Sequence, residues 1–159
     1  MNTIFILLIL FQLKHFIADY PLQGKYMLGK FKGGKDWILP LLCHVAVHGL
    51  FTFIIVSLYK PNDALLLAML DMSIHFIMDR IKASPDMLGR YKPLTKEEYI
   101  HIQTELPRYI GFTRNNDTIK TREGFYRQLK GNTYFWWALG LDQGVHHLTH
   151  YLIIYLIVS

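Results

Sequence analysis

Long stretches without charged residues limit what this chain can fold into. Residues 3–13 and 37–59 contain no Asp, Glu, Lys or Arg, and residues 134–158 contain one acid, Asp142. Residues 63–79 contain three acids and no base. A helix needs about 20 apolar residues to span a bilayer core, and each stretch with its flanks can supply them. We therefore predict an all-α integral membrane four-helix bundle. The predicted single membrane domain is residues 1–159, with transmembrane helices at about 2–21, 37–59, 63–82 and 133–158.

The composition excludes several other classes of protein. Hydrophobic residues make up 52% of the 159 residues, which is too many for a disordered chain. The single cysteine, Cys43, excludes a disulfide scaffold and an all-cysteine zinc cluster. The chain is also basic, with a formal net charge of +5, and it contains eight His. A basic nucleic-acid-binding protein would not segregate its apolar residues in this way, so we expect no nucleic-acid partner.

The basic residues predict the orientation in the membrane. They concentrate between the first and second spans, and between the third and fourth, where a long loop covers residues 83–132. The positive-inside rule places both loops in the cytoplasm, which predicts a multi-pass protein of the inner membrane with both termini outside. Lys30 is counted among these loop charges, and Lys14 is expected to extend from the first span to the interface. A signal peptide is excluded by the absence of a basic segment before the first apolar stretch.

The long loop carries its own signals. Thr95 followed by Glu98 is typical of a capping box, which predicts a short helix that ends near Pro107. Aromatic residues alternate with basic ones along the loop, which suits contact with anionic lipid headgroups; a solvated loop is the alternative. The expected partners are therefore membrane lipids. Four spans make a thin bundle, which is consistent with a homodimer.

Ionisable residues inside the predicted spans recur four positions apart. This spacing places the members of each set on one helix face. Burying such a group in hydrocarbon costs roughly 2.5–3.5 kcal/mol, so these side chains must face one another, a cavity or an ion. The sets are His15 and Asp19; His44 and His48; Asp71, His75 and Asp79; and Asp142, His146 and His150.

Most of these residues lie at a similar depth, in the cytoplasmic half of the predicted bundle. Imidazole and carboxylate groups together suit Zn²⁺, Fe²⁺ or Mn²⁺, and an inward-facing His/Asp array in a four-helix bundle is a known type of metal site. We expect a divalent metal, most simply zinc, with enough donors for two ions. Asp71 is left open between a ligand and a supporting group. The predicted ligands are His15, Asp19, His44, His48, His75, Asp79, Asp142, His146 and His150, of which Asp19, Asp79 and Asp142 are the candidate catalytic bases.

The same segments resemble a known family. They read His15-Phe-Ile-Ala-Asp19, His44-Val-Ala-Val-His48, His75-Phe-Ile-Met-Asp79 and Asp142-Gln-Gly-Val-His146. In this order they resemble the family called domain of unknown function 3307, which contains small bacterial and phage membrane proteins. That family is more distantly similar to membrane-bound proteins described as metal-dependent hydrolases. The resemblance implies a metal-dependent hydrolase, with Gln23 and Gln143 as polar supports of the site.

Four hypotheses for function follow. The first is a membrane-embedded metal-dependent hydrolase that acts at the cytoplasmic leaflet on a lipid or lipid-linked ester, amide or phosphoester. The second is a transporter of a metal ion or protons, which would need polar residues through the whole bundle. The third is a haem protein with two His ligands. The fourth is a regulatory membrane protein whose metal only stabilises the fold.

Overall fold

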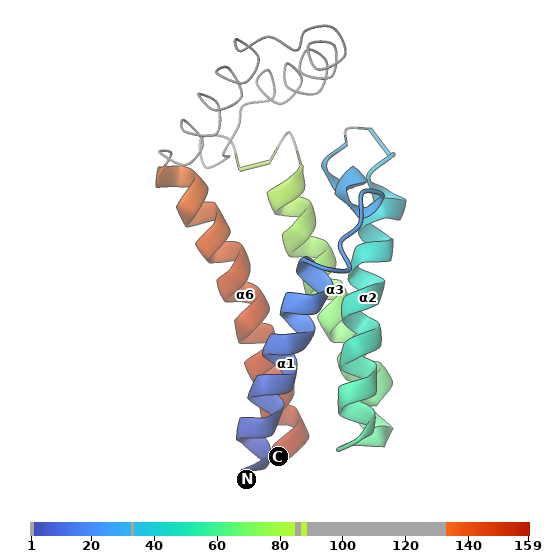
Figure 1. Ribbon diagram of the computed structural model, residues 1–159, viewed down its shortest axis with the longest axis vertical. Coiled ribbons are helices and arrows are strands. Elements are labelled where there is room, and N and C mark those ends of the chain that lie inside the picture. The colour runs from blue at the N-terminus through green and yellow to red at the C-terminus, as the bar shows by residue number, and fades with distance from the viewer. Residues whose placement is uncertain (1, 33, 85–86, 89–132) are drawn as a thin grey trace, which may run out of the picture. The chain divides into compact units, whose positions relative to one another are not determined.

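The computed structural model describes residues 2–32, 34–84, 87–88 and 133–159. These described residues form α-helices and no strand, which confirms the all-helical prediction (Figure 1). The first and last residues of each α-helix lie within two residues of the corresponding ends of a predicted span. The predicted short helix near Thr95 lies outside the described residues. The helices are α1 (Thr3–Asp19), α2 (Ile38–Ser57), α3 (Ala64–Ala83) and α6 (Thr133–Val158).

The chain divides into two compact units. The first is Met1–Ser84 with Asp142–Ser159, and the second is Pro85–Leu141. All the predicted site residues belong to the first unit, and the following description concerns that unit. Whether the whole chain acts as a single membrane domain stays a prediction.

Consecutive helices of the first unit run in opposite directions (Figure 1). Residues 58–63, which include the short 3₁₀ helix η2 (Pro61–Asp63), connect α2 to α3. The connection from α1 to α2 contains a second 3₁₀ helix, η1 (Met27–Phe31), which the sequence analysis did not predict. Because the helices alternate, the start of α1, the end of α2, the start of α3 and the end of α6 lie at one end of the bundle.

Buried residues recur every three or four positions along each helix. On α3 the buried side chains are Ala64, Leu67, Ala68, Asp71, His75, Asp79 and Ala83. This spacing places them in one stripe that faces the other helices. The stripe is apolar at its beginning and carries its polar residues, Asp71, His75 and Asp79, further along, and on the other helices the buried ionisable residues likewise lie toward the same end of the bundle.

The apolar end of the bundle is a packed hydrophobic core. It forms where α1 begins and α6 ends, and Leu7, Val56 and Ile153 are fully buried there. Nothing in this cluster is charged or polar. Its buried members are Leu7, Phe11, Ile55, Val56, Ala64, Leu67, Ile153, Ile154 and Ile157.

The α2 and α3 helices approach each other closely at Gly49. A Cβ atom at this position would lie 2.3 Å from Cγ of Met72, which is closer than two carbon atoms can pack. Gly49 therefore allows the two helices to come together beside the polar half of the bundle. Small residues at helix contacts have this role in many membrane proteins.

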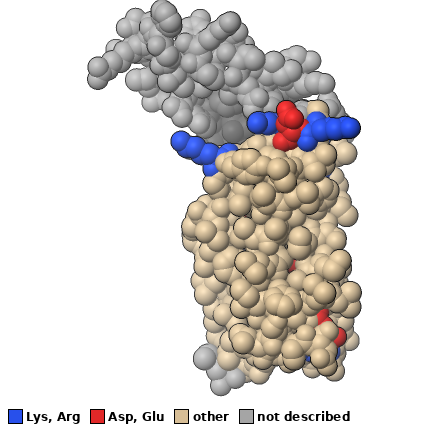
Figure 2. Space-filling view, turned by 90° about the vertical axis from the view of Figure 1, so that its right-hand side faces the viewer, with Lys and Arg blue, Asp and Glu red and all other residues tan. Residues whose placement is uncertain are grey.

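The outer surface of the helices is apolar. Figure 2 shows one broad face almost without Lys, Arg, Asp or Glu, with charged side chains gathered mainly at one end. Large apolar side chains are exposed along the middle of the helices, including Leu50 (59%), Met69 (57%) and Leu148 (66%). A water-soluble bundle would place most such side chains inside, whereas here polar residues occupy the interior of one half of the bundle.

One described helix, α2, is long and apolar enough to cross a membrane on its own. α1 has 17 residues, and α3 carries three charged side chains between Asp71 and Arg80. The structure thus supports a membrane association through α2, whereas four spans with both termini outside stay a prediction.

Candidate metal centre

Six imidazoles from all four helices form one cluster. The ring centroids of His48 and His75 are 4.0 Å apart, and those of His75 and His146 are also 4.0 Å apart with nearly parallel planes. The ring of His15 lies 5.3 Å from that of His150. All six rings are buried, with at most 4% of each residue exposed. The members are His15, His44, His48, His75, His146 and His150.

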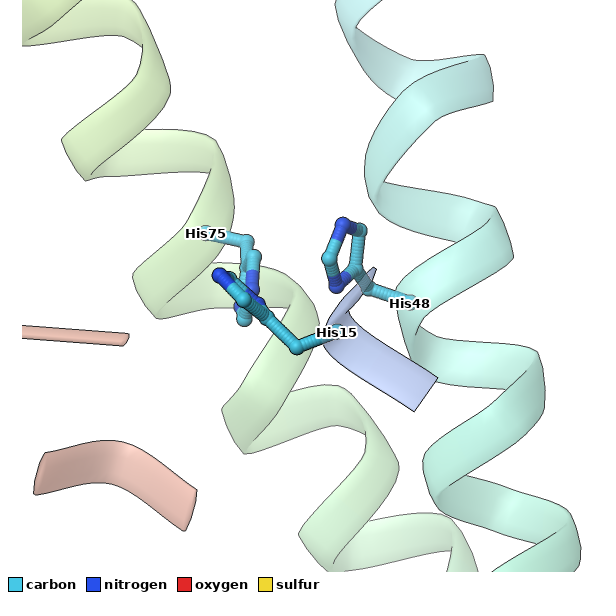
Figure 3. Close-up of side chains that lie close together, drawn as sticks. All are labelled: His15, His48 and His75. Atoms are coloured by element: carbon cyan, nitrogen blue, oxygen red, sulfur yellow. The ribbon is translucent and has the colours of Figure 1, made fainter. Parts of the chain in front are cut away.

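Three of these residues are arranged as metal ligands would be. His15 on α1, His48 on α2 and His75 on α3 lie close together (Figure 3). One ring nitrogen of each lies within 4.8 Å of a ring nitrogen of the other two. Three helices therefore bring a three-imidazole group to one point in the bundle.

Each of these three rings is held through one nitrogen. In His75, Nδ1 donates to the backbone oxygen of Asp71 at 3.0 Å. In His15, Nε2 donates to Oε1 of Gln143 at 3.0 Å, and in His48, Nε2 donates to Oδ1 of Asp19 at 3.0 Å. The other ring nitrogen of each residue is buried and has no hydrogen-bond partner among the described residues. Metal-binding His residues have this pattern, in which one nitrogen is oriented by a polar group and the other is left for the ion.

Asp19 lies at the more exposed side of the cluster. Its carboxylate is within 3.0–3.4 Å of Nε2 of His15, His44 and His48. The side chain is 18% exposed, compared with 4% for Asp79 and 2% for Asp142. Asp19 with His44 and His48 forms a second group that could hold a metal ion.

A third candidate group contains Asp79, Asp142 and His146. Here each carboxylate is paired with a lysine. Nζ of Lys30 donates to Oδ2 of Asp79 at 3.1 Å, and Lys82 pairs with Asp142. Lys30 lies in the connection between α1 and α2, as predicted, but its side chain is 6% exposed and paired with Asp79, a contact that the sequence analysis did not predict.

The short helix η1 brings Lys30 to Asp79. Gly29 packs against α2, where a Cβ atom would lie 2.9 Å from Cγ of Pro40. Because the glycine has no side chain, η1 can pack against the start of α2, and the Lys30 side chain enters the bundle. The sequence carried little sign of this arrangement, since the helix is one short turn in a connecting segment.

The deepest polar group surrounds Asp71. Lys14 pairs with its carboxylate, and Oγ1 of Thr52 donates to Oδ2 at 2.7 Å. Nζ of Lys14 is also 3.1 Å from Nε2 of His150. The expectation that Lys14 extends to the membrane interface is wrong, because only 1% of its side chain is exposed. Its position fits the buried stripe of α1, in which Leu7, Phe11, Lys14 and Ala18 follow each other at helical spacing.

The structure brings all nine predicted ligands into this polar half of the bundle and adds Asp71 to them. His147, which is off this face, is half-buried, and its Nδ1 lies 3.2 Å from Nε2 of Gln12. Cys43 is half-buried and belongs to none of the candidate groups. Sequence reasoning missed Lys14, Lys30 and Thr52 as members of the site. Metal binding itself stays a prediction.

The comparisons with known proteins agree with the first three motifs, whereas the motif from Asp142 to His146 lies outside the matched residues. The family described as "Protein of unknown function (DUF3307)" matches residues 6–105, which include α2, α3 and α1 from Ile6 onward. No curated protein and no solved structure matches the chain. The matched residues make up more than half of the sequence and carry His15, His48 and His75. This chain therefore belongs to the DUF3307 family of proteins of unknown function.

Proposed function

We propose that this protein is a membrane-embedded, metal-dependent hydrolase. It acts at the cytoplasmic leaflet on a lipid or lipid-linked ester, amide or phosphoester. The observation that carries the proposal is the set of three buried imidazoles, His15, His48 and His75, each with one oriented and one partnerless nitrogen. A buried polar atom without a partner is costly, and a bound ion would remove that cost.

The donor set fits zinc in a catalytic role. Three neutral nitrogen ligands with a free fourth position are typical of catalytic zinc sites, whereas structural sites use four protein ligands. Gln143, Asp19 and the backbone of Asp71 orient the three rings. A bound divalent ion supplies Lewis-acid activation of water and of the bond to be cleaved.

Residues around the imidazoles can accept a proton and attract the substrate. Asp19 is the best placed proton acceptor, because it borders the imidazoles and keeps part of its carboxylate exposed. Asp79 and Asp142 are less suited to this role, since Lys30 and Lys82 pair with their carboxylates. Lys82 is 32% exposed and can also attract an anionic headgroup.

The inverted distribution of side chains supports a membrane location. Exposed leucines and isoleucines surround an interior that holds the His, Asp and Lys residues. We propose that α1, α3 and α6 span the membrane together with α2, with both termini outside. Helices with a polar stripe can lie in a bilayer when that stripe faces other helices. The 20-residue helices α2 and α3 are about 30 Å long at 1.5 Å per residue, which matches the hydrocarbon core.

The first experiment measures metal in the detergent-purified protein by elemental analysis. We expect a stoichiometric divalent metal that is lost in His48→Ala and His75→Ala. The matched control is His147→Ala, because His147 lies beside the cluster but belongs to no candidate group. Wild-type protein without metal after purification with added zinc would overturn the proposal.

The second experiment tests hydrolysis with p-nitrophenyl esters and bis-p-nitrophenyl phosphate in mixed micelles. Asp19→Asn is expected to keep the metal and to lose at least 100-fold in kcat, since general-base catalysis contributes about 10²–10⁴-fold. Equal activity of Asp19→Asn and wild type would remove Asp19 from the mechanism.

A purely structural metal is the second candidate function. The deep burial of His75, with 0% exposed, favours it, because an ion there would join three helices without contacting solvent. In that case His75→Ala would lose both metal and fold, and no substrate would be cleaved. A transporter is disfavoured by the apolar core that closes the other end of the bundle.

A further inference from the structure

The deep polar group contains a cation that belongs to the protein itself. Asp71, His75 and His150 have donor atoms within 4.8 Å of one another, as a metal site requires. The ammonium of Lys14 pairs with Asp71 and lies 3.1 Å from Nε2 of His150. A metal ion bound to these same atoms would therefore have to displace the ammonium or lie against it.

Electrostatic repulsion disfavours a metal ion and the Lys14 ammonium in this group at the same time. Two positive charges about 4 Å apart in a buried, weakly screened environment repel each other strongly. The Lys14 side chain is 1% exposed, so it cannot reach water without rearrangement of the bundle. Thr52 also donates to Oδ2, the oxygen that Lys14 contacts, so Oδ1 of Asp71 is the carboxylate oxygen without a hydrogen-bond partner among the described residues. An ion at Oδ1 would lie next to the ammonium that pairs with the same carboxylate.

The net charge of the His/Asp cluster also limits how many divalent ions it can hold. The aspartates that contact the imidazoles are Asp19, Asp71, Asp79 and Asp142, and three of them are paired with Lys14, Lys30 or Lys82. With neutral imidazoles the described cluster has one excess negative charge. One divalent ion would change this net charge from about −1 to about +1, whereas two would raise it to about +3 in a buried site.

We propose that Lys14 is a built-in cation that fills the Asp71–His75–His150 group and excludes a metal ion from it. The lysine reduces by one the number of divalent ions that the His/Asp cluster can bind. His75 belongs both to this group and to the three-imidazole group, so Lys14 also keeps Asp71 available to orient His75. This inference rests on the proposal that the three-imidazole group binds metal.

The test is the metal-to-protein ratio of variants purified with zinc and measured by elemental analysis. Lys14→Met keeps an unbranched side chain one atom shorter and removes the charge. Lys14→Gln provides an amide donor for Asp71 in case Lys14→Met does not fold. Both are expected to bind one more zinc ion per chain than wild type. Lys14→Met/Asp71→Asn, which removes the acidic ligand, is expected to return to the wild-type ratio.

The outcomes separate the two proposals. If Lys14→Met and Lys14→Gln keep the wild-type ratio, Lys14 does not exclude a metal ion and the inference is overturned. If wild type binds no zinc but Lys14→Gln binds one ion, the proposed function fails while the role of Lys14 stands. The matched control is Lys60→Met, because Lys60 also pairs with an aspartate, Asp63, but both side chains are exposed. This variant should leave the metal-to-protein ratio unchanged.

Discussion

The two halves of the bundle are built from the same helices with opposite chemistry. In one half, side chains such as Leu7, Val56 and Ile153 form a dry core. In the other, ion pairs and imidazoles fill the interior at the same helical spacing. The apolar half can account for stable packing alone. Burying the charges of the polar half costs desolvation energy, which is offset only if every charge has a partner. Ionisable residues inside a membrane bundle are therefore found mainly where a functional site requires them.

The largest effect is expected where one charge of the polar half loses its partner. Asp71→Ala leaves the buried Lys14 ammonium uncompensated and should lower the free energy of unfolding by about 3–5 kcal/mol. Denaturant titration of the protein in detergent micelles measures this change. Lys14→Met/Asp71→Leu removes both charges and should recover most of the loss. Equal destabilisation of the single and double variants would show that shape and not charge determines the cost.

The next prediction concerns the outer surface shared by the two halves. Leu50 lies near the middle of α2 and is 59% exposed. If it faces lipid, Leu50→Arg should disfavour insertion by about 2.5–3.5 kcal/mol. Extraction of membranes with alkaline carbonate measures the inserted fraction, with Leu50→Ala as the control. An arginine variant that inserts as well as the alanine variant would place this face in water.

A smaller effect is expected where α2 and α3 meet beside the polar half. Gly49→Ala places a Cβ atom against the Met72 side chain and should cost about 1–3 kcal/mol of stability. Met72→Ala removes the obstructing atoms, so the double variant should be more stable than Gly49→Ala. Thermal unfolding of the three variants in detergent provides the comparison. A double variant no more stable than Gly49→Ala would mean that the obstacle is backbone and not Met72.

The smallest effect is expected in the apolar half. Ile153 is fully buried, and Ile153→Val removes one methylene, which should cost about 0.5–1.5 kcal/mol. The metal content should stay at the wild-type value, because Ile153 belongs to the apolar cluster and to none of the candidate groups. Unfolding and elemental analysis of the same sample check both statements. Loss of metal in this variant would contradict the division of the bundle into independent halves.

The sequence predicted the helices well because their signals are local. Uncharged stretches and i, i+4 spacing depend only on neighbouring residues, and eight of the nine predicted ligands are buried, with Asp19 partly exposed. The partners of the charges were harder to predict. A lysine side chain is long and flexible enough to reach an interface or to turn inward, and its sequence position alone does not decide which.

Lys14 and Lys30 illustrate the two reasons for this difficulty. The place of Lys14 in the Leu7, Phe11 and Ala18 stripe was a readable signal, but its charge suggested the interface. For Lys30 the deciding contact is between η1 and α2 at Gly29 and Pro40, which no local pattern reveals. Which ring nitrogens lack partners also follows only from three-dimensional packing.

The short connection between α2 and α3 has a consequence for biogenesis. Thr52 and Asp71 are 19 positions apart and bond directly, whereas His15 and Gln143 are 128 positions apart. Closing a short segment loses less chain entropy and occurs faster than joining distant ones. We therefore expect the α2–α3 hairpin to assemble first. His15, His48 and His75 are all synthesised before α6, so the nascent chain carries its three imidazoles before Gln143, which fixes the His15 ring, has left the ribosome.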